Sequence, residues 1–95
     1  MSWNIHPGEV LLEEFMKPLN LNSNQLAHLL GGPAPRINDI VLQKRGITAD
    51  TALRLSQFFG NSAKFWLGLQ DDYDIENELN EKQEELGHIK RFAAA

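Results

Sequence analysis

The side chains with the clearest chemical potential lie close together in the stretch SNQLAHLLGGPAPRINDIVL, residues 23–42. Asn38 carries an amide that can pair bidentately with adenine, and Arg36 carries a guanidinium that can reach guanine or a phosphate. Arg36 and Asp39 also have a simpler alternative, an i,i+3 surface ion pair worth only about 0.2–0.5 kcal/mol. The DNA-reading role requires an element that presents these side chains to a groove.

The spacing of small and apolar residues around them is typical of a helix-turn-helix. Ala27 is followed by Gly31 four residues later, by Ile37 after ten and by Ile40 after thirteen. A small residue at 27 lets the second helix cross closely, Gly31 can take the positive φ of the turn, and the isoleucines seat the second helix on the core. Such a motif docks its second helix in the major groove. Two helices joined by a glycine turn also occur in ordinary bundles, so the spacing alone leaves both readings open.

Start and stop signals along the chain predict an all-α fold of five helices with short linkers and no strand. These signals are the cap and helix-start residues Pro7, Asn22, Thr48 and Ser62, and the stop residues Pro18, Gly31 and Gly60. Gln25, three residues after Asn22, completes a capping-box pattern.

Apolar periodicity predicts the first helix and a C-terminal extension. In the first helix, one apolar face is predicted from Leu12, Phe15, Met16 and Leu19, with Leu11 beside it, and Pro18 should end the helix near Lys17. From about Asp74 the chain becomes polar and acidic, with a thin apolar stripe that predicts a further helix. We therefore expect a domain over residues 1–73 and an acidic C-terminal helical extension over residues 74–95.

Length and composition predict one small globular domain. The chain has 95 residues, of which 42% are hydrophobic and 23% charged, and it contains no cysteine. We expect a cytoplasmic location, because the start lacks the features of a secretory signal and no apolar run is long enough to span a membrane. The net charge of −4 divides into +1 over residues 1–70 and −5 over residues 71–95. Any affinity for DNA should therefore rest on locally placed cations.

Catalysis and metal binding find little support in the sequence. His6, His28 and His88 fall in separate segments without paired ligand spacing, so neither a metal site nor a cofactor is expected. Glu13 and Glu14 are neighbours that point in different directions and form no acid–base pair. No catalytic nucleophile, Walker loop or Rossmann glycine pattern is present. We do not expect an enzyme.

Longer motifs resemble a known family. HPGEVLLEEFMKPLNL, NQLAHLLG, RINDIV, KRGITADTALRLSQFFG and FWLGLQDDYD are similar to the HigA group of antitoxins, also called VapI-like, within the phage-repressor (XRE-like) class of helix-turn-helix regulators. The resemblance covers about residues 5–75. It implies a five-helix phage-repressor-like domain, and a dimer that represses its own operon and neutralises a HigB-type, mRNA-cleaving toxin.

The same resemblance implies the surface that contacts operator DNA. Base contacts would come from the second helix of the motif, at Ala34, Pro35, Arg36, Asn38 and Asp39. Phosphate contacts would come from Ser23, Asn24, Lys44 and Arg45. Relatives usually have a polar or basic residue where this chain has Ala34, which bears on the operator sequence and on the affinity.

Aromatic and apolar residues near the fifth helix exceed what so small a core needs. Phe65, Trp66, Leu69 and Tyr73 are therefore predicted to form the dimer interface. The acidic C-terminal segment can either attract a basic toxin surface or simply keep the dimer soluble. Two alternatives stay open beside the antitoxin: a free-standing transcriptional repressor without a toxin, and a protein-interaction module that has lost operator binding.

Overall fold

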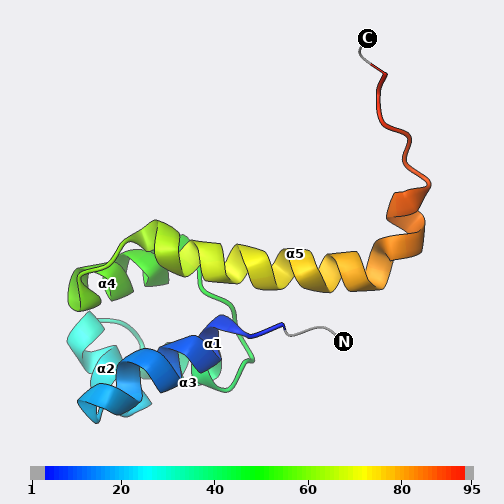
Figure 1. Cartoon of the computed structure of the whole chain (residues 1–95). Coiled ribbons are helices and arrows are strands. Elements are labelled where there is room, and N and C mark those ends of the chain that lie inside the picture. The colour runs from blue at the N-terminus through cyan, green and yellow to red at the C-terminus, as the bar shows by residue number, and fades with distance from the viewer. Residues whose placement is uncertain (1–3, 94–95) are drawn as a thin grey trace.

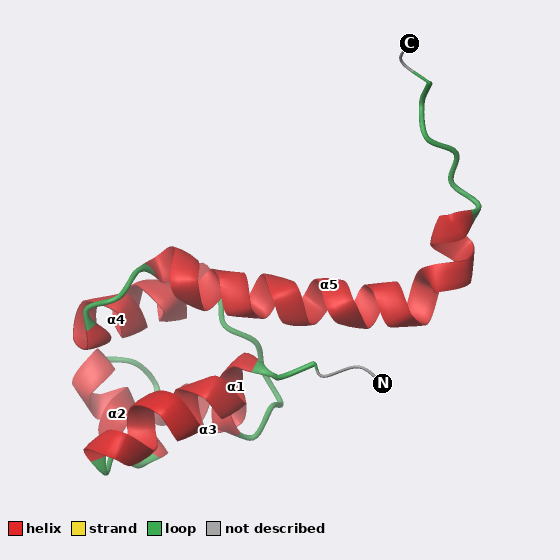
Figure 2. Ribbon diagram, in the orientation of Figure 1, coloured by secondary structure: helices red, strands yellow, loops and turns green. Residues whose placement is uncertain are grey.

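The computed structural model describes residues 4–93, and within this range it contains helices and no strand (Figures 1 and 2). The elements, in chain order, are α1 (Pro7–Val10), continued by a π-helical stretch (Leu11–Met16) and a 3₁₀ turn (Lys17–Leu19), then α2 (Ser23–Leu30), α3 (Ala34–Val41), α4 (Ala49–Phe59) and α5 (Ala63–Gly87). The predicted all-α, five-helix fold is confirmed.

The first helical segment differs from the prediction in its length and in its buried face. It runs to Leu19 rather than ending near Lys17, because Pro18 lies in the first positions of the 3₁₀ turn, where its missing N–H costs nothing. The π-helical stretch adds a residue to the turn, and Lys17 N–H bonds back to Leu12 O, five residues earlier. This change of period rotates Leu11 into the core and leaves Leu19 56% exposed, so the expected place of Leu19 on the buried face was wrong.

Residues from the π-helical stretch, from α2, α3, α4 and α5, and from the loop before α4 meet in one core. Its members are Leu11, Met16, Leu26, Ala27, Ile37, Ile40, Ile47, Ala52, Leu55 and Trp66. Burial of this apolar surface is the main stabilising contribution available to a domain of this size. Ile37 and Ile40 fix α3 on the core, so the position of α3 is set by the packing of the other helices.

Gly8 lets α1 lie directly on the backbone of α3. The glycine is buried, and a Cβ placed on it would overlap the carbonyl oxygen of Ile40 in α3. His6 caps this helix, because its Nδ1 accepts a hydrogen bond from Gly8 N–H at 2.9 Å. The first helix therefore supports α3 from the side of the core.

The predicted C-terminal extension is the second half of α5. A helical stretch of 25 residues runs from Ala63 to Gly87 and is kinked at Lys82, where the φ and ψ angles are non-helical (−114° and 18°). Figure 1 shows its far half leaving the body and bending near its end. All side chains over residues 78–93 are exposed. The separate sixth helix from Asp74 is therefore not found, and the division at residue 73 stays a prediction, with residues 1–3 and 94–95 outside the described range.

Candidate nucleic-acid interface

The turn between α2 and α3 has the geometry that the spacing predicted. Gly31 ends α2 with φ of +70°, and Gly32 N–H bonds back to Ala27 O at 3.1 Å. A left-handed residue at this point closes the helix without a Cβ clash. Ala27, Ile37 and Ile40 are all buried where the two helices pack together. The helix-turn-helix is thus a property of the folded chain as well as of its sequence pattern.

The start of α2 and the outer face of α3 border one surface hollow of about 570 Å³. It is lined by Asn22, Ser23, Asn24, Ala34, Pro35 and Asn38. The capping box fixes its α2 side, since Asn22 Oδ1 accepts from Gln25 N–H at 2.8 Å and Gln25 Oε1 accepts from Asn22 N–H at 2.9 Å. Five of the nine residues predicted to contact DNA are therefore brought together.

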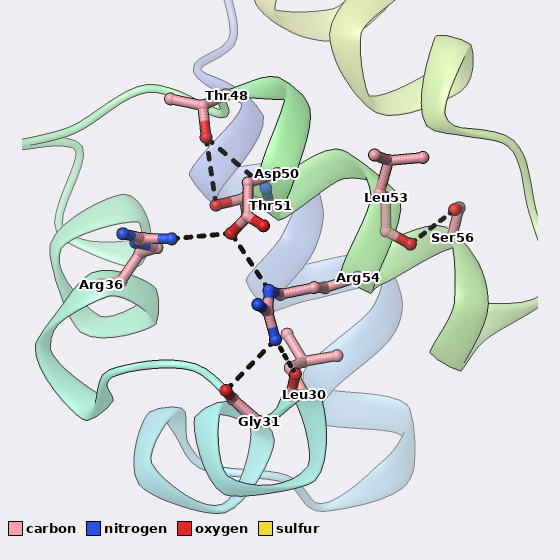
Figure 3. A network of polar contacts seen from close by, with 9 residues as sticks. All are labelled: Leu30, Gly31, Arg36, Thr48, Asp50, Thr51, Leu53, Arg54 and Ser56. Carbon is pink, nitrogen blue, oxygen red and sulfur yellow. Dashed lines mark hydrogen bonds and ion pairs between the residues drawn. The ribbon is translucent and has the colours of Figure 1, made fainter.

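Arg36 lies outside this hollow and faces α4. Its Nη1 donates to Asp50 Oδ2 at 2.9 Å, so the guanidinium pairs across the helices and not with Asp39 (Figure 3). Asp39 lies 3.9 Å from Arg45 instead, measured from Oδ2 to Nη2. The i,i+3 ion pair between Arg36 and Asp39, kept open as an alternative, is replaced by these two contacts.

The basic turn after α3 is held by its backbone. Gln43 adopts a left-handed conformation with φ of 64°, and Lys44 N–H bonds back to Asp39 O at 2.8 Å. This leaves the Lys44 and Arg45 side chains exposed at the end of α3. Asparagine, aspartate and glycine are the residues usually expected at positive φ, so the left-handed conformation of Gln43 could not be predicted from its residue type.

Asp50 and Arg54 were not among the residues predicted for this surface. Arg54 Nε donates to Asp50 Oδ2 at 3.0 Å, and its Nη1 donates to Leu30 O at 2.8 Å and to Gly31 O at 3.2 Å. These carbonyl groups end α2 and would otherwise lack a partner in the helix. The i,i+4 spacing of Asp50 and Arg54 was a readable signal for their own pairing, whereas their link to Arg36 was not.

His6 and Tyr73 join the N-terminal segment to α5. Their rings make an edge contact with centroids 4.8 Å apart, and Asn4 Nδ2 donates to Tyr73 O at 3.0 Å and to Asn77 Oδ1 at 2.7 Å. Burial lowers the pKa of His6 below its ordinary value of 6.5, and the Asp74 carboxylate opposes this with a smaller effect. The neutral imidazole is thus the form that suits its capping role.

Residues predicted to form the dimer interface divide into two kinds. Trp66 is fully buried, and its Nε1 donates to Asn61 Oδ1 at 2.8 Å. The indole fills the core of its own chain, so its assignment to the interface is revised. Phe65 is 41% exposed, while Leu69 and Tyr73 are half-buried. These three keep surface that a second copy can cover.

Residues 4–93 were also compared with the requirements of a membrane span and of a metal site. No helix in this range is long and apolar enough to cross a membrane. Within the same residues, no group of three or more histidine, aspartate or glutamate side chains is placed to hold a metal ion.

The turn at Gly31, the packing of α2 against α3 and the hollow along α3 together have the geometry of a helix-turn-helix. No family model matches the sequence. Virulence-associated protein I of Dichelobacter nodosus is 51% identical over 79 residues, covering 83% of this chain and 73% of that protein. Antitoxin HigA-1 of Vibrio cholerae is 31% identical over 83 residues, covering 87% and 78%. The structure of Pseudomonas aeruginosa antitoxin HigA with the higBA promoter matches with a TM-score of 0.89 and 38% identity over 95% of this chain and 98% of that one. The chain belongs to the HigA family of helix-turn-helix antitoxins.

Proposed function

We propose that this chain is a dimeric antitoxin that represses its own operon and neutralises an mRNA-cleaving toxin of the HigB type. The observation that carries the DNA-binding part is the hollow shared by the start of α2 and the outer face of α3. The similarity to an antitoxin solved with its promoter supports the same assignment.

The hollow divides DNA contacts between two helices. Asn38 is exposed on α3 and offers both its amide donor and its acceptor to an adenine. Ser23 and Asn24 lie at the N-terminus of α2, where free N–H groups and the helix dipole favour a phosphate. Lys44 and Arg45 supply cations at the other end of α3. Ala34 adds no polar group to the hollow, so base reading depends on the remaining side chains.

Dimer formation is proposed through the proximal part of α5. One recognition helix reads too few base pairs for adequate specificity, whereas a two-fold dimer sets two of them about 34–36 Å apart on successive major grooves. Phe65, Leu69 and Tyr73 provide partly exposed apolar surface for this contact.

Toxin binding is proposed for the distal half of α5. Residues 74–86 hold six Asp or Glu and one Lys, and Ile75, Leu79 and Leu86 border an apolar hollow of about 280 Å³ among them. An RNase that binds RNA must present basic surface, which this acidic face complements. Regulation by binding requires no catalysis, so we propose that the chain is not an enzyme. It would act where its DNA and its toxin are, in the cytoplasm.

The DNA-binding part is tested with duplex DNA from upstream of the chain's own gene. We expect a saturable complex containing two copies per site, measured by gel shift and by sedimentation. Monomers only, at micromolar protein with and without this DNA, would contradict the dimer. Failure to prefer the upstream DNA over a random duplex would favour the protein-interaction module.

The toxin part is tested with the small protein encoded beside the gene. We expect Leu79→Ser to weaken this complex, because it removes an exposed apolar side chain from the acidic face. Leu53→Ser in α4 is the matched control, since Leu53 is 56% and Leu79 48% exposed. Equal binding by both variants would place the toxin elsewhere. No binding by the parent chain would favour a free-standing repressor.

A further inference from the structure

The carboxylate of Asp50 links three helices, α2, α3 and α4, through two arginine side chains. Asp50 Oδ2, in the first turn of α4, accepts from Arg36 Nη1 at 2.9 Å and from Arg54 Nε at 3.0 Å (Figure 3). Arg54 continues the network to the carbonyl groups that end α2. A side chain of the recognition helix α3 is therefore connected to both neighbouring helices through a single oxygen atom.

The network is too exposed to be explained by stability alone. The side chains of Arg36, Asp50 and Arg54 are 31%, 54% and 42% exposed. Ion pairs this open to solvent are each worth about 0–1 kcal/mol. Its clearer effect is geometric, because a guanidinium is planar and a hydrogen bond at one Nη1 fixes the direction of its other donors. Arg36 can then meet DNA in one orientation rather than many.

We propose that Asp50 is a positioning residue for DNA specificity, acting through Arg36. This inference rests on the proposed DNA-binding face. Asp50 holds the Arg36 guanidinium at the side of α3 next to α4, where its remaining N–H groups are free to read a base edge. It also offsets part of the charge that Arg36 and Arg54 would otherwise offer to any phosphate.

These two effects act in the same direction on specificity. A fixed guanidinium gains from the correct base, and each good bidentate contact discriminates by about 1–3 kcal/mol. A guanidinium paired with a carboxylate gains less from backbone phosphates, which are the source of non-specific affinity. Loss of the Asp50 charge should therefore weaken the first effect and strengthen non-specific binding.

The experiment compares Asp50→Asn with the parent chain on two probes, the upstream DNA and a random duplex of equal length. We expect the ratio of the two affinities to fall at least about fivefold, which corresponds to the lower end of one base contact. On the random duplex the salt slope should become steeper by about 0.9 per copy. Asp72→Asn is the matched control, because Asp72 is an exposed acid on α5 and its replacement changes the net charge equally. Thermal unfolding of each variant confirms that the fold is intact.

A double-mutant cycle tests whether Asp50 acts through Arg36. In an Arg36→Ala background, adding Asp50→Asn should leave the affinity ratio unchanged within about twofold. The proposal is overturned if Asp50→Asn leaves the ratio of the parent unchanged, if Asp72→Asn lowers it equally, or if the effect persists without Arg36. If the parent itself shows no preference for the upstream DNA, the proposed function fails first, and this inference with it.

Discussion

Replacing Gly8 with alanine tests whether α1 sets the position of the recognition helix. The structure places this glycine against the backbone of α3, and an added Cβ would overlap the Ile40 carbonyl oxygen. A flexible side chain could rotate away from such a contact, but a backbone carbonyl held in a helix cannot. We therefore expect α1 and α3 to separate, with a cost to both stability and DNA binding.

The magnitude follows from two opposing terms. Adding a methyl group to a closely packed contact costs about 1–3 kcal/mol. Alanine in place of glycine in a helix returns about 0.5–1 kcal/mol. Because the overlap is with backbone, we expect the packing term to prevail and the free energy of unfolding to fall by about 1–2 kcal/mol. Operator affinity should fall as well, since Ile40 belongs to α3.

Gly68→Ala is the matched control. Gly68 lies inside α5, and a Cβ built there meets nothing within 4 Å. This substitution should raise the free energy of unfolding by about 0.5–1 kcal/mol through helix propensity alone. Urea unfolding curves of the two variants and the parent measure both changes in the free energy of unfolding, provided that the m-values are the same. If Gly8→Ala is as stable as Gly68→Ala, α1 does not rest on the backbone of α3, and the proposed support of α3 by α1 is refuted.

Three further predictions concern single side chains. Asn38→Ala should weaken operator binding by about 1–3 kcal/mol and relax specificity at one base position. Asn80→Ala, at an exposed position of α5, is the control and should do neither. Equal DNA-binding curves for the two variants would refute base reading by Asn38. Arg45→Ala should weaken binding to all sequences and reduce the salt slope by about one unit per copy, with Arg91→Ala as control; an unchanged slope would remove the phosphate assignment. Burial lowers the pKa of His6, so the unfolded chain binds the proton of this side chain more tightly than the folded chain does. The contribution of the neutral His6 to the free energy of unfolding is therefore fully present above the ordinary pKa of 6.5 and decreases as the pH falls below it. Urea unfolding at a series of pH values should show this loss, and His6→Asn, which keeps a cap acceptor, should reduce it.

The sequence predicted the helix caps and the glycine turn of the helix-turn-helix, because these features depend on neighbouring residues in the chain. The capping box of Asn22 and Gln25 and the left-handed Gly31 both form as expected, because each depends on residues within three or four positions. The burial of Ala27, Ile37 and Ile40 follows for the same reason, since these residues keep the regular helical period. These features define most of the helix-turn-helix.

Features that depend on tertiary contacts were not predictable. The period of the first helix changes at its π-helical stretch, which moved Leu11 to the core and Leu19 to the surface. Trp66 was assigned to an interface because composition cannot tell a surplus aromatic residue from a core one. Arg36 has its nearest acid in sequence three residues away, yet it pairs with Asp50, fourteen residues away. Only the packing of α4 beside α3 decides that partner.

The charge of the DNA face leads to a final prediction, on the salt dependence of the parent chain. Arg36, Lys44, Arg45 and Arg54 are balanced in part by Asp39 and Asp50, which gives this set a net charge of only +2 per copy. The Arg45 contact with Asp39 is long, at 3.9 Å, so a phosphate can readily replace it. The Arg36 contact with Asp50 is short and shared with Arg54, so it should persist in the complex.

Two cations per copy, Lys44 and Arg45, then remain to neutralise phosphates. A dimer would neutralise about four phosphates, and log K should fall against log salt with a slope of about −3.6. Release of Arg36 to the backbone would raise the count to about six and the slope to about −5.4. Titrations of the upstream DNA over a range of salt concentrations distinguish these values. A slope near the steeper one would mean that Arg36 leaves Asp50 for a phosphate, in which case specificity must come from Asn38 and from the spacing of the two copies.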